Sequence, residues 1–322
     1  MRLPRDAAMS DKKQGYIYIV LTTLLFSCVE IVLKFVSGGF NPLQMTFSRF
    51  FVGGLVLLPL ALRALKKRGI RPDAKAFRRF ALLGFVGMFV SMTLYQMALL
   101  YTNASVVAVL FSGNTLFTAF FAFLLLGEAI HARNIIALLF DIGGILLIVQ
   151  PWNTKLSVLG VVLTLSAAII FSLYGVMGKE SCAKYGGVVV SCMSFLFGSL
   201  EMMAAALLSH IPVIAAFFEG HGLPQLARIP FIAGYHPDNL ITMLLVYIIF
   251  TGIGYCCYFM AMEKTSAQTT SLVFFFKPAL APVLAMLVLR EEIPLNMVAG
   301  IVCILLGSLV SLFGGRLSKR AS

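Results

Sequence analysis

The chain has 322 residues, of which 60% are hydrophobic and only 12% are charged, and its mean hydropathy is +0.96. A soluble globular domain carries about 25% charged residues, so this composition excludes that class and indicates an integral membrane protein. The formal net charge of +12 does not indicate a nucleic-acid partner, because the basic residues flank apolar runs and no soluble basic domain exists to hold a duplex.

Ten apolar runs follow a short polar start, MRLPRDAAMSDKKQ. Each run has about 20 residues, the length of helix that crosses a hydrocarbon core of about 30 Å. The sequence therefore predicts an all-α integral membrane protein with ten transmembrane helices, joined mostly by short connections. The predicted helices are Gly15–Ser37, Pro42–Leu62, Phe80–Tyr101, Ala104–Leu126, Asn134–Val149, Ser157–Gly178, Val188–Ser209, Leu240–Met262, Ala267–Leu289 and Pro294–Phe313.

Basic residues between the runs predict the orientation of the chain. The connection after the second run holds eight basic residues and one acid, Asp73, which places it in the cytoplasm. Lys179 and Lys184 are expected on another cytoplasmic turn. With ten spans, both ends are then cytoplasmic tails, residues 1–14 and 314–322, and the first of them lacks a signal-peptide cleavage site. We expect a multi-pass protein of the inner or plasma membrane.

The second half of the chain repeats the first. Residues 95–149 align with residues 258–312 without a gap, at a shift of 163 residues, and the start of each half aligns at a shift of 145. The predicted repeats, 15–150 and 157–313, hold five helices each, and an odd number inserts the two copies in opposite orientations. Such inverted repeats are typical of secondary transporters, whose substrate site lies near the membrane midplane where the halves meet. The matched pairs include Gly15/Gly160, Phe26/Phe171, Lys34/Lys179, Gly53/Gly198, Tyr95/Tyr258, Ala98/Ala261, Thr102/Thr265, Phe111/Phe274 and Glu128/Glu291.

The end of each half resembles a known family. The segments 124–144 (LLLGEAIHARNIIALLFDIGG) and 287–308 (LVLREEIPLNMVAGIVCILLGS), together with Phe47–Phe50, are similar to EamA-type transporters of the drug/metabolite transporter superfamily. This resemblance implies a ten-helix inverted-repeat fold with a central cavity, and the usual export of amino acids, other small metabolites or drugs. Many relatives have an acidic residue before the proline of the ninth helix, where this chain has Lys277, and the difference argues against a cationic substrate.

Ionisable residues inside the predicted spans carry the chemistry. Each costs about 2.5–3.5 kcal/mol at the centre of a membrane helix, so these residues must pair or face water. Glu30 and Arg49 lie at similar depths on successive helices, and two interpretations stay open: a structural ion pair, or contact of one or both with substrate or a proton. The five residues concerned are Glu30, Arg49, Asp141, Glu201 and Lys277.

Lys277 stands near the middle of the ninth run and is followed by two prolines, a combination that indicates a water-lined cavity. Its repeat counterpart, Asn114, is also polar. We expect Lys277 to contact substrate or the coupling ion, with structural pairing to Asp141 or Glu201 as the alternative. Lys34 is a different case, because it lies near the end of its helix and is expected to be a solvated anchor.

Tyrosines are the remaining candidates for the wall of a cavity. Tyr95 and Tyr258 match in the repeat and each has a hydroxyl to satisfy, whereas Phe274–Phe276 are expected to pack in the core or against lipid. The candidate substrate-binding or coupling residues are Lys277, Glu30, Arg49, Asn114, Tyr95, Tyr258, Tyr174 and Glu201.

These patterns favour a secondary transporter that exports a small polar or zwitterionic metabolite, such as an amino acid, by alternating access. Two alternatives stay open: a proton-coupled multidrug exporter of apolar cations, and a membrane protein that keeps the fold without transporting. We expect no enzyme, cofactor or metal site, because the sequence has no P-loop, no C-x-x-C spacing and no paired histidine ligands.

Overall fold

The computed structural model describes residues 5–37, 39–127, 132–150 and 157–318. All regular structure in these ranges is helical, which confirms the predicted all-α class. Seven helices are long and apolar enough to cross a membrane, and three shorter apolar helices accompany them, covering 135–148, 280–289 and 295–307. The seven spans are Lys13–Lys34, Pro42–Arg68, Ala74–Tyr101, Ala104–Leu126, Val158–Tyr185, Gly187–Leu208 and Pro237–Lys264.

The helices follow the predicted runs closely, with a few differences at their ends. The first begins at Arg5 instead of Gly15, and Lys179 and Lys184 lie in the last turns of a helix instead of on a turn. The α-helices are α1 (Arg5–Ser37), α2 (Pro42–Arg68), α3 (Ala74–Leu83), α4 (Met92–Tyr101), α5 (Ala104–Ser112), α6 (Asn114–Leu126), α7 (Ala132–Val149), α8 (Val158–Tyr185), α9 (Gly187–Leu208), α10 (Pro212–Gly220), α11 (Pro237–Leu245), α12 (Gly254–Lys264), α13 (Ala267–Thr270), α14 (Val273–Leu289) and α15 (Leu295–Ser318).

Local signals account for several of these boundaries. Helix α2 begins at Pro42, whose missing N–H is not needed in the first turn, and the Asn41 side chain accepts hydrogen bonds from the next two backbone N–H groups. Two runs predicted as single helices are divided, one at Gly113 between α5 and α6, the other at Ser271 and Leu272 between α13 and α14.

Two π-helical segments occupy corresponding places in the two halves. They are η1 (Gly84–Ser91), between α3 and α4, and η3 (Val246–Ile253), between α11 and α12. Each packs on a repeat-matched glycine: a Cβ added to Gly198 would lie 2.8 Å from a backbone atom of η1, and one added to Gly53 would lie 3.2 Å from a backbone atom of η3. The short element η2 (Pro224–Leu226) lies in the connection between α10 and α11.

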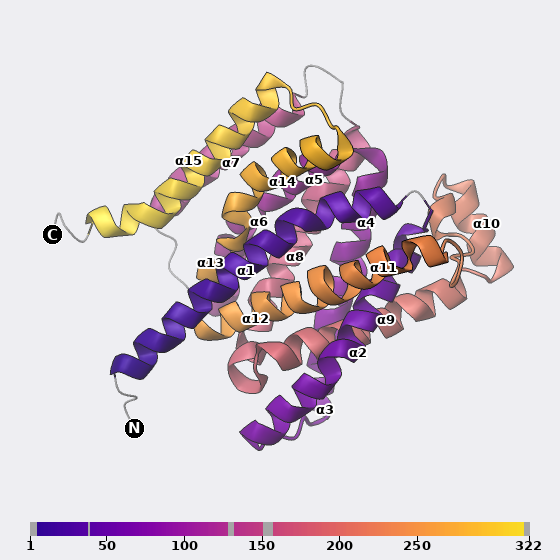
Figure 1. Ribbon diagram of the computed structural model, residues 1–322, viewed down its shortest axis with the longest axis horizontal. Coiled ribbons are helices and arrows are strands. Elements are labelled where there is room, and N and C mark those ends of the chain that lie inside the picture. The colour runs from indigo at the N-terminus through magenta and orange to yellow at the C-terminus, as the bar shows by residue number, and fades with distance from the viewer. Residues whose placement is uncertain (1–4, 38, 128–131, 151–156, 319–322) are drawn as a thin grey trace.

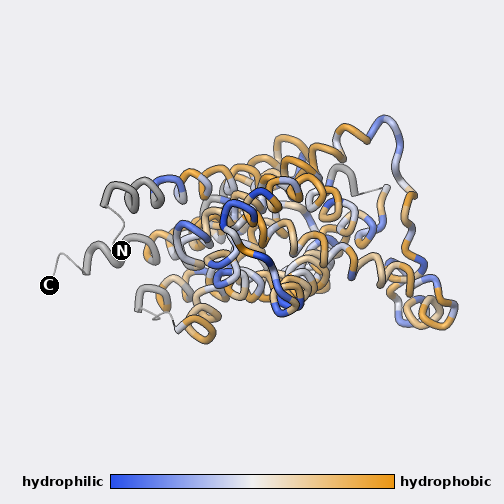
Figure 2. The backbone as a smooth tube through the Cα atoms, turned by 90° about the horizontal axis from the view of Figure 1, so that it is seen from below, coloured by the Kyte–Doolittle hydropathy of each residue, from blue (hydrophilic) through white to orange (hydrophobic). Residues whose placement is uncertain are grey.

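The helices pack as a bundle, and α1 runs diagonally across it with one face exposed (Figure 1). Helix α1 lies against α12 on one side and α14 on the other, while α2 packs on α9 and α7 packs on α15. Most of the helical tube is hydrophobic, and hydrophilic stretches gather in the connections (Figure 2). The beginning of α1 and the end of α15 lie at the same end of the bundle in Figure 1.

Helices α1 and α8 run in opposite directions between the same two points. Helix α1 passes Thr265 at Gly15, where an added Cβ would touch that residue, and further along it Lys34 donates to the Thr102 carbonyl. Helix α8 begins near Thr102, which a Cβ at Gly160 would touch, and its Lys179 donates to the Thr265 carbonyl.

The pairing of α7 with α15 leads to a prediction about two adjacent glycines. Gly144→Ala is expected to lower the thermal midpoint in detergent and to cost about 1–3 kcal/mol by overpacking, because its Cβ would lie 2.6 Å from Ile304 and 2.7 Å from the Gly300 carbonyl. Gly143→Ala is the matched control, since its Cβ meets nothing within 4 Å. Equal midpoints for the two variants would contradict the observed helix contact.

Candidate functional site

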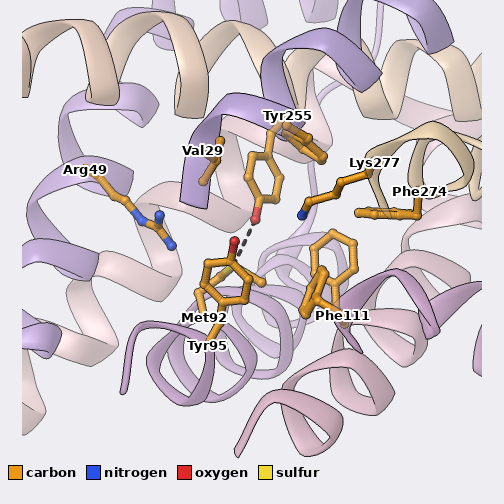
Figure 3. A pocket seen from close by; sticks show the side chains of 10 residues that line it. Val29, Arg49, Met92, Tyr95, Phe111, Tyr255, Phe274 and Lys277 are labelled. Carbon is orange, nitrogen blue, oxygen red and sulfur yellow. Dashed lines mark hydrogen bonds between the residues drawn. The ribbon is translucent and has the colours of Figure 1, made fainter. Parts of the chain in front are cut away.

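A pocket lies at the centre of the bundle (Figure 3). Its free volume is about 20 Å³, room for about one water molecule and far below the roughly 300–1,000 Å³ of small-molecule sites, so the space between its rings is narrow in this structure. Its walls come from both halves of the chain. The lining residues are Phe26, Val29, Arg49, Met92, Tyr95, Phe111, Phe171, Tyr255, Phe274 and Lys277.

Lys277 of α14 forms an ion pair with Glu30 of α1, the helix packed beside it. Both are buried, with side-chain exposures of 3% and 0%. Neither sequence-based expectation named this pair: Glu30 does not pair with Arg49, and Lys277 pairs with neither Asp141 nor Glu201. The two charges compensate each other, which accounts for their tolerance at this depth.

Three aromatic rings surround the ammonium group of Lys277. Its Nζ lies 5.0 Å from the ring centroid of Phe111, 5.6 Å from that of Phe274 and 5.8 Å from that of Tyr95. Rings at these distances attract a cation through their quadrupoles. Phe274 packs in the core, as expected, and it also lines the pocket.

Arg49 reaches the same pocket from α2, on the side opposite Lys277 (Figure 3). It is only 2% exposed, and its Nε and Nη2 have no hydrogen-bond partner among the described residues. Its guanidinium carbon lies 4.6 Å from the ring centroid of Phe50. A buried guanidinium without an acceptor is costly, so this is the least satisfied group in the pocket.

The rest of the wall follows the internal repeat. Phe26 and Phe171 match at the 145-residue shift, and Phe111 and Phe274 match at the 163-residue shift. Met92 and Tyr255 match at the same shift of 163, and the Tyr255 hydroxyl donates to the Met92 sulfur at 2.9 Å. The repeat alignment was therefore the sequence signal that could have identified these residues.

The charges do not follow this symmetry. At the same shifts, Glu30 corresponds to Gly175, Arg49 to Ser194 and Lys277 to Asn114, all uncharged. The pocket thus combines a wall of repeat-matched side chains with an asymmetric set of charges.

The other sequence-based candidates lie outside the pocket wall. Asn114, Tyr174 and Tyr258 are buried, and Tyr258 packs against Phe171 at 5.8 Å between ring centroids. The side-chain atoms of Asn114 have no hydrogen-bond partner within the described ranges. Glu201 lines a separate groove together with basic residues of α3, and these are Lys75, Arg78 and Arg79.

Two repeat-matched lysines cap helix ends at opposite ends of the bundle. Lys34 donates to the carbonyls of Leu99 and Thr102, the second at 3.1 Å, at the end of α4. Lys179 donates to the carbonyls of Met262 and Thr265, both at 2.5 Å, at the end of α12. The expectation that Lys34 is a solvated anchor is wrong, because backbone carbonyls replace water around its ammonium group.

At each end of the bundle, a carboxylate accepts hydrogen bonds from backbone N–H groups at the start of a helix. Glu291 accepts from the backbone N–H groups of Ala104 and Ser105, at 2.9 and 3.1 Å, at the start of α5. Glu263 pairs with Arg68 and accepts from the Gly187 N–H at 2.7 Å. The repeat counterpart of Glu291 in the first half, Glu128, lies outside the described residues.

The cap on α5 gives a prediction with a matched control. Glu291→Ala is expected to cost about 0.5–2 kcal/mol of stability, the usual range for a lost helix cap, and to lower the thermal midpoint. Glu292→Ala is the control, because the neighbouring side chain is exposed. A Glu292→Ala midpoint as low as that of Glu291→Ala would show that the cap contributes nothing.

No candidate metal site occurs in the part of the chain that the structure describes. No group of three or more His, Cys, Asp or Glu side chains in that part could hold a metal ion. The six cysteines, all within the described ranges, are free.

Comparison with known proteins adds the family. The model of the EamA-like transporter family matches residues 13–150 and again 158–313. An uncharacterized transporter from Clostridium kluyveri is 34% identical over 307 residues, 93% of each chain. A probable terminal-alkyne amino-acid exporter from Streptantibioticus cattleyicolor is 23% identical and covers 88% of each chain.

A solved crystal structure shares the fold. It superposes with a TM-score of 0.67 and 16% identity over 93% of this chain and 97% of that one. The two family matches span most of the sequence, and the names of both relatives describe transport proteins. This chain therefore belongs to the EamA-like transporter family and is a multi-pass membrane protein.

Proposed function

We propose that this protein exports a small polar or zwitterionic metabolite, such as an amino acid or a relative of one, by alternating access through the central pocket. The observation that carries the proposal is a buried charged cluster, Arg49 and the Glu30–Lys277 pair, in a pocket lined by both halves of the chain. Buried ionisable groups in membrane bundles mark substrate or ion pathways. The name of the Streptantibioticus cattleyicolor relative supports an amino-acid substrate and the outward direction.

We further propose ten spans arranged as two inverted five-helix repeats, 15–150 and 157–313. The protein would lie in the inner membrane with both termini in the cytoplasm. The opposite course of α1 and α8 between Thr102 and Thr265 supports the inversion. The beginning of α1 and the end of α15 lie at the same end of the bundle, which supports an even number of spans.

The transport step follows from the closed state of the site. Glu30 and Lys277 hold each other while the pocket is narrow, and charged groups of the substrate compete for them as the two halves rock. Glu30 is the candidate coupling residue, since its carboxylate gains or loses a partner during the cycle.

The test is counterflow of a radiolabelled amino-acid mixture in proteoliposomes. Wild type is expected to accumulate label, while Glu30→Gln and the double variant Glu30→Gln/Lys277→Met lose about tenfold or more, the effect expected when one substrate contact of about 1.4 kcal/mol is lost. Lys66→Met, at an exposed position of α2, is the control and retains the activity. Undiminished counterflow in the double variant would refute the role of the pair.

Another outcome would point to a different function. Saturable transport of tetraphenylphosphonium without transport of amino acids would favour the multidrug alternative. Two cations facing the pocket argue against that outcome, because like charges repel.

A further inference from the structure

The pocket contains more positive than negative charge. Arg49 and Lys277 both line it, and Glu30 is the carboxylate paired with Lys277. Glu30 also interacts electrostatically with Arg49, but it forms its ion pair with Lys277. With one carboxylate for two cations, the site has a net charge of +1.

The excess charge is located on Arg49. Lys277 already has a carboxylate and three aromatic rings around its ammonium group. The guanidinium of Arg49 lies against one ring, Phe50, but its Nε and Nη2 donors have no acceptor among the described residues, although the side chain is 2% exposed and points into the pocket (Figure 3). A ligand that supplied acceptors to these two donors would remove the cost of leaving them unsatisfied.

The geometry of the two donors selects the ligand chemistry. Donors on Nε and on one terminal nitrogen form the planar fork that binds the two oxygens of a carboxylate. Beyond the fork, the wall is apolar and aromatic, formed by Phe26, Phe111, Phe171 and Phe274. A carboxylate held by Arg49 would therefore direct the rest of the ligand between these rings.

We propose that Arg49 binds the carboxylate of the substrate, and that the substrate is a small monocarboxylate with an apolar or aromatic side chain, amino acids of this kind included. This rests on the proposed function and assigns the carboxylate to Arg49, not to Lys277, which was expected to contact substrate or the coupling ion. Lys277 instead remains with Glu30 until the pocket opens.

The binding experiment uses three probes that differ in their charged groups: phenylalanine, phenylalaninamide and 3-phenylpropionate. In a thermal-shift assay in detergent, phenylalanine and 3-phenylpropionate are expected to raise the midpoint of wild type, since a ligand that binds the native state stabilises it. Phenylalaninamide lacks the carboxylate and is expected to bind about tenfold more weakly or worse, the loss of one charge-assisted contact.

Variants of Arg49 separate binding from folding. Arg49→Gln is expected to fold with an unchanged or higher midpoint in the absence of ligand, because it removes an unpartnered buried charge, and to lose the shift with both acids. Arg49→Lys keeps the charge without the fork and is expected to give a reduced shift. Lys66→Met is the control and shifts as wild type does.

The other outcomes contradict either this proposal or the proposed function. An amide that binds as tightly as the acid, or an Arg49→Gln protein that retains the full shift, would show that the carboxylate does not bind Arg49. Absence of a shift with all three probes would rule out an aromatic monocarboxylate. A protein that binds the acids in detergent but gives no counterflow would contradict the proposed function and leave the role of Arg49 intact.

Discussion

Lys277→Met is expected to destabilise the protein by about 3–5 kcal/mol, because it leaves the fully buried carboxylate of Glu30 without its cation. Glu30 lies at 0% exposure, and water cannot replace the lost partner without opening the bundle. The measurement is the thermal midpoint of the purified protein in detergent, or the fraction of protein that survives extraction and gel filtration as a single peak.

The double variant Glu30→Gln/Lys277→Met completes the thermodynamic cycle. Removing both charges leaves no uncompensated ion, so most of the lost stability is expected to return, although counterflow does not. Arg49→Gln is the matched comparison, since it also removes a buried cation of the same pocket but one without a carboxylate partner. If Lys277→Met and the double variant were equally unstable, the pair would not be the reason for the loss.

Helix positions could be predicted from the sequence because hydropathy and capping are local. Helix α2 begins at Pro42 as predicted, since Asn41 and Pro42 form a cap within three residues of sequence. The divisions at Gly113 and Ser271 were not predicted, because the short polar stretches there, residues 112–115 and 268–271, lie within runs that are apolar overall.

The pairing inside the pocket could not be predicted from depth alone. Glu30 and Arg49 lie on successive helices, but which neighbour each faces depends on how α1 is rotated against α12 and α14, a property of the whole bundle. The resulting partner of Glu30 is Lys277, far away in sequence.

The role of Lys34 was missed although the repeat contained a signal for it. A lysine whose ammonium group is only solvated is not expected at the same position of both repeats, yet Lys34 matches Lys179. Both cap the end of a helix, and their acceptors Thr102 and Thr265 match as well. Agreement between repeats was therefore stronger evidence than the position of either lysine in its helix.

The two lysine caps are expected to control opposite ends of the transport path. Gly15 and Lys34 are 19 residues apart on α1, about 28 Å at 1.5 Å per residue, and they mark the ends at Thr265 and Thr102. Lys34→Met removes donors to two carbonyls at the Thr102 end, and Lys179→Met does so at the Thr265 end. Each charged hydrogen bond contributes about 1.5–3 kcal/mol, so each variant is expected to shift the equilibrium about tenfold or more towards the form open at its own end.

Cysteine labelling with a membrane-impermeant maleimide measures this shift. The reporters are cysteines introduced at Ala98 and Ala261, repeat-matched residues at 0% exposure, in a protein whose six native cysteines are replaced by alanine. Lys34→Met is expected to increase labelling at position 98 and not at 261, and Lys179→Met the reverse, with Lys66→Met as the control that changes neither. An increase at the same reporter in both lysine variants would mean that the caps stabilise the bundle as a whole instead of closing opposite ends, and alternating access would then need another pair of contacts.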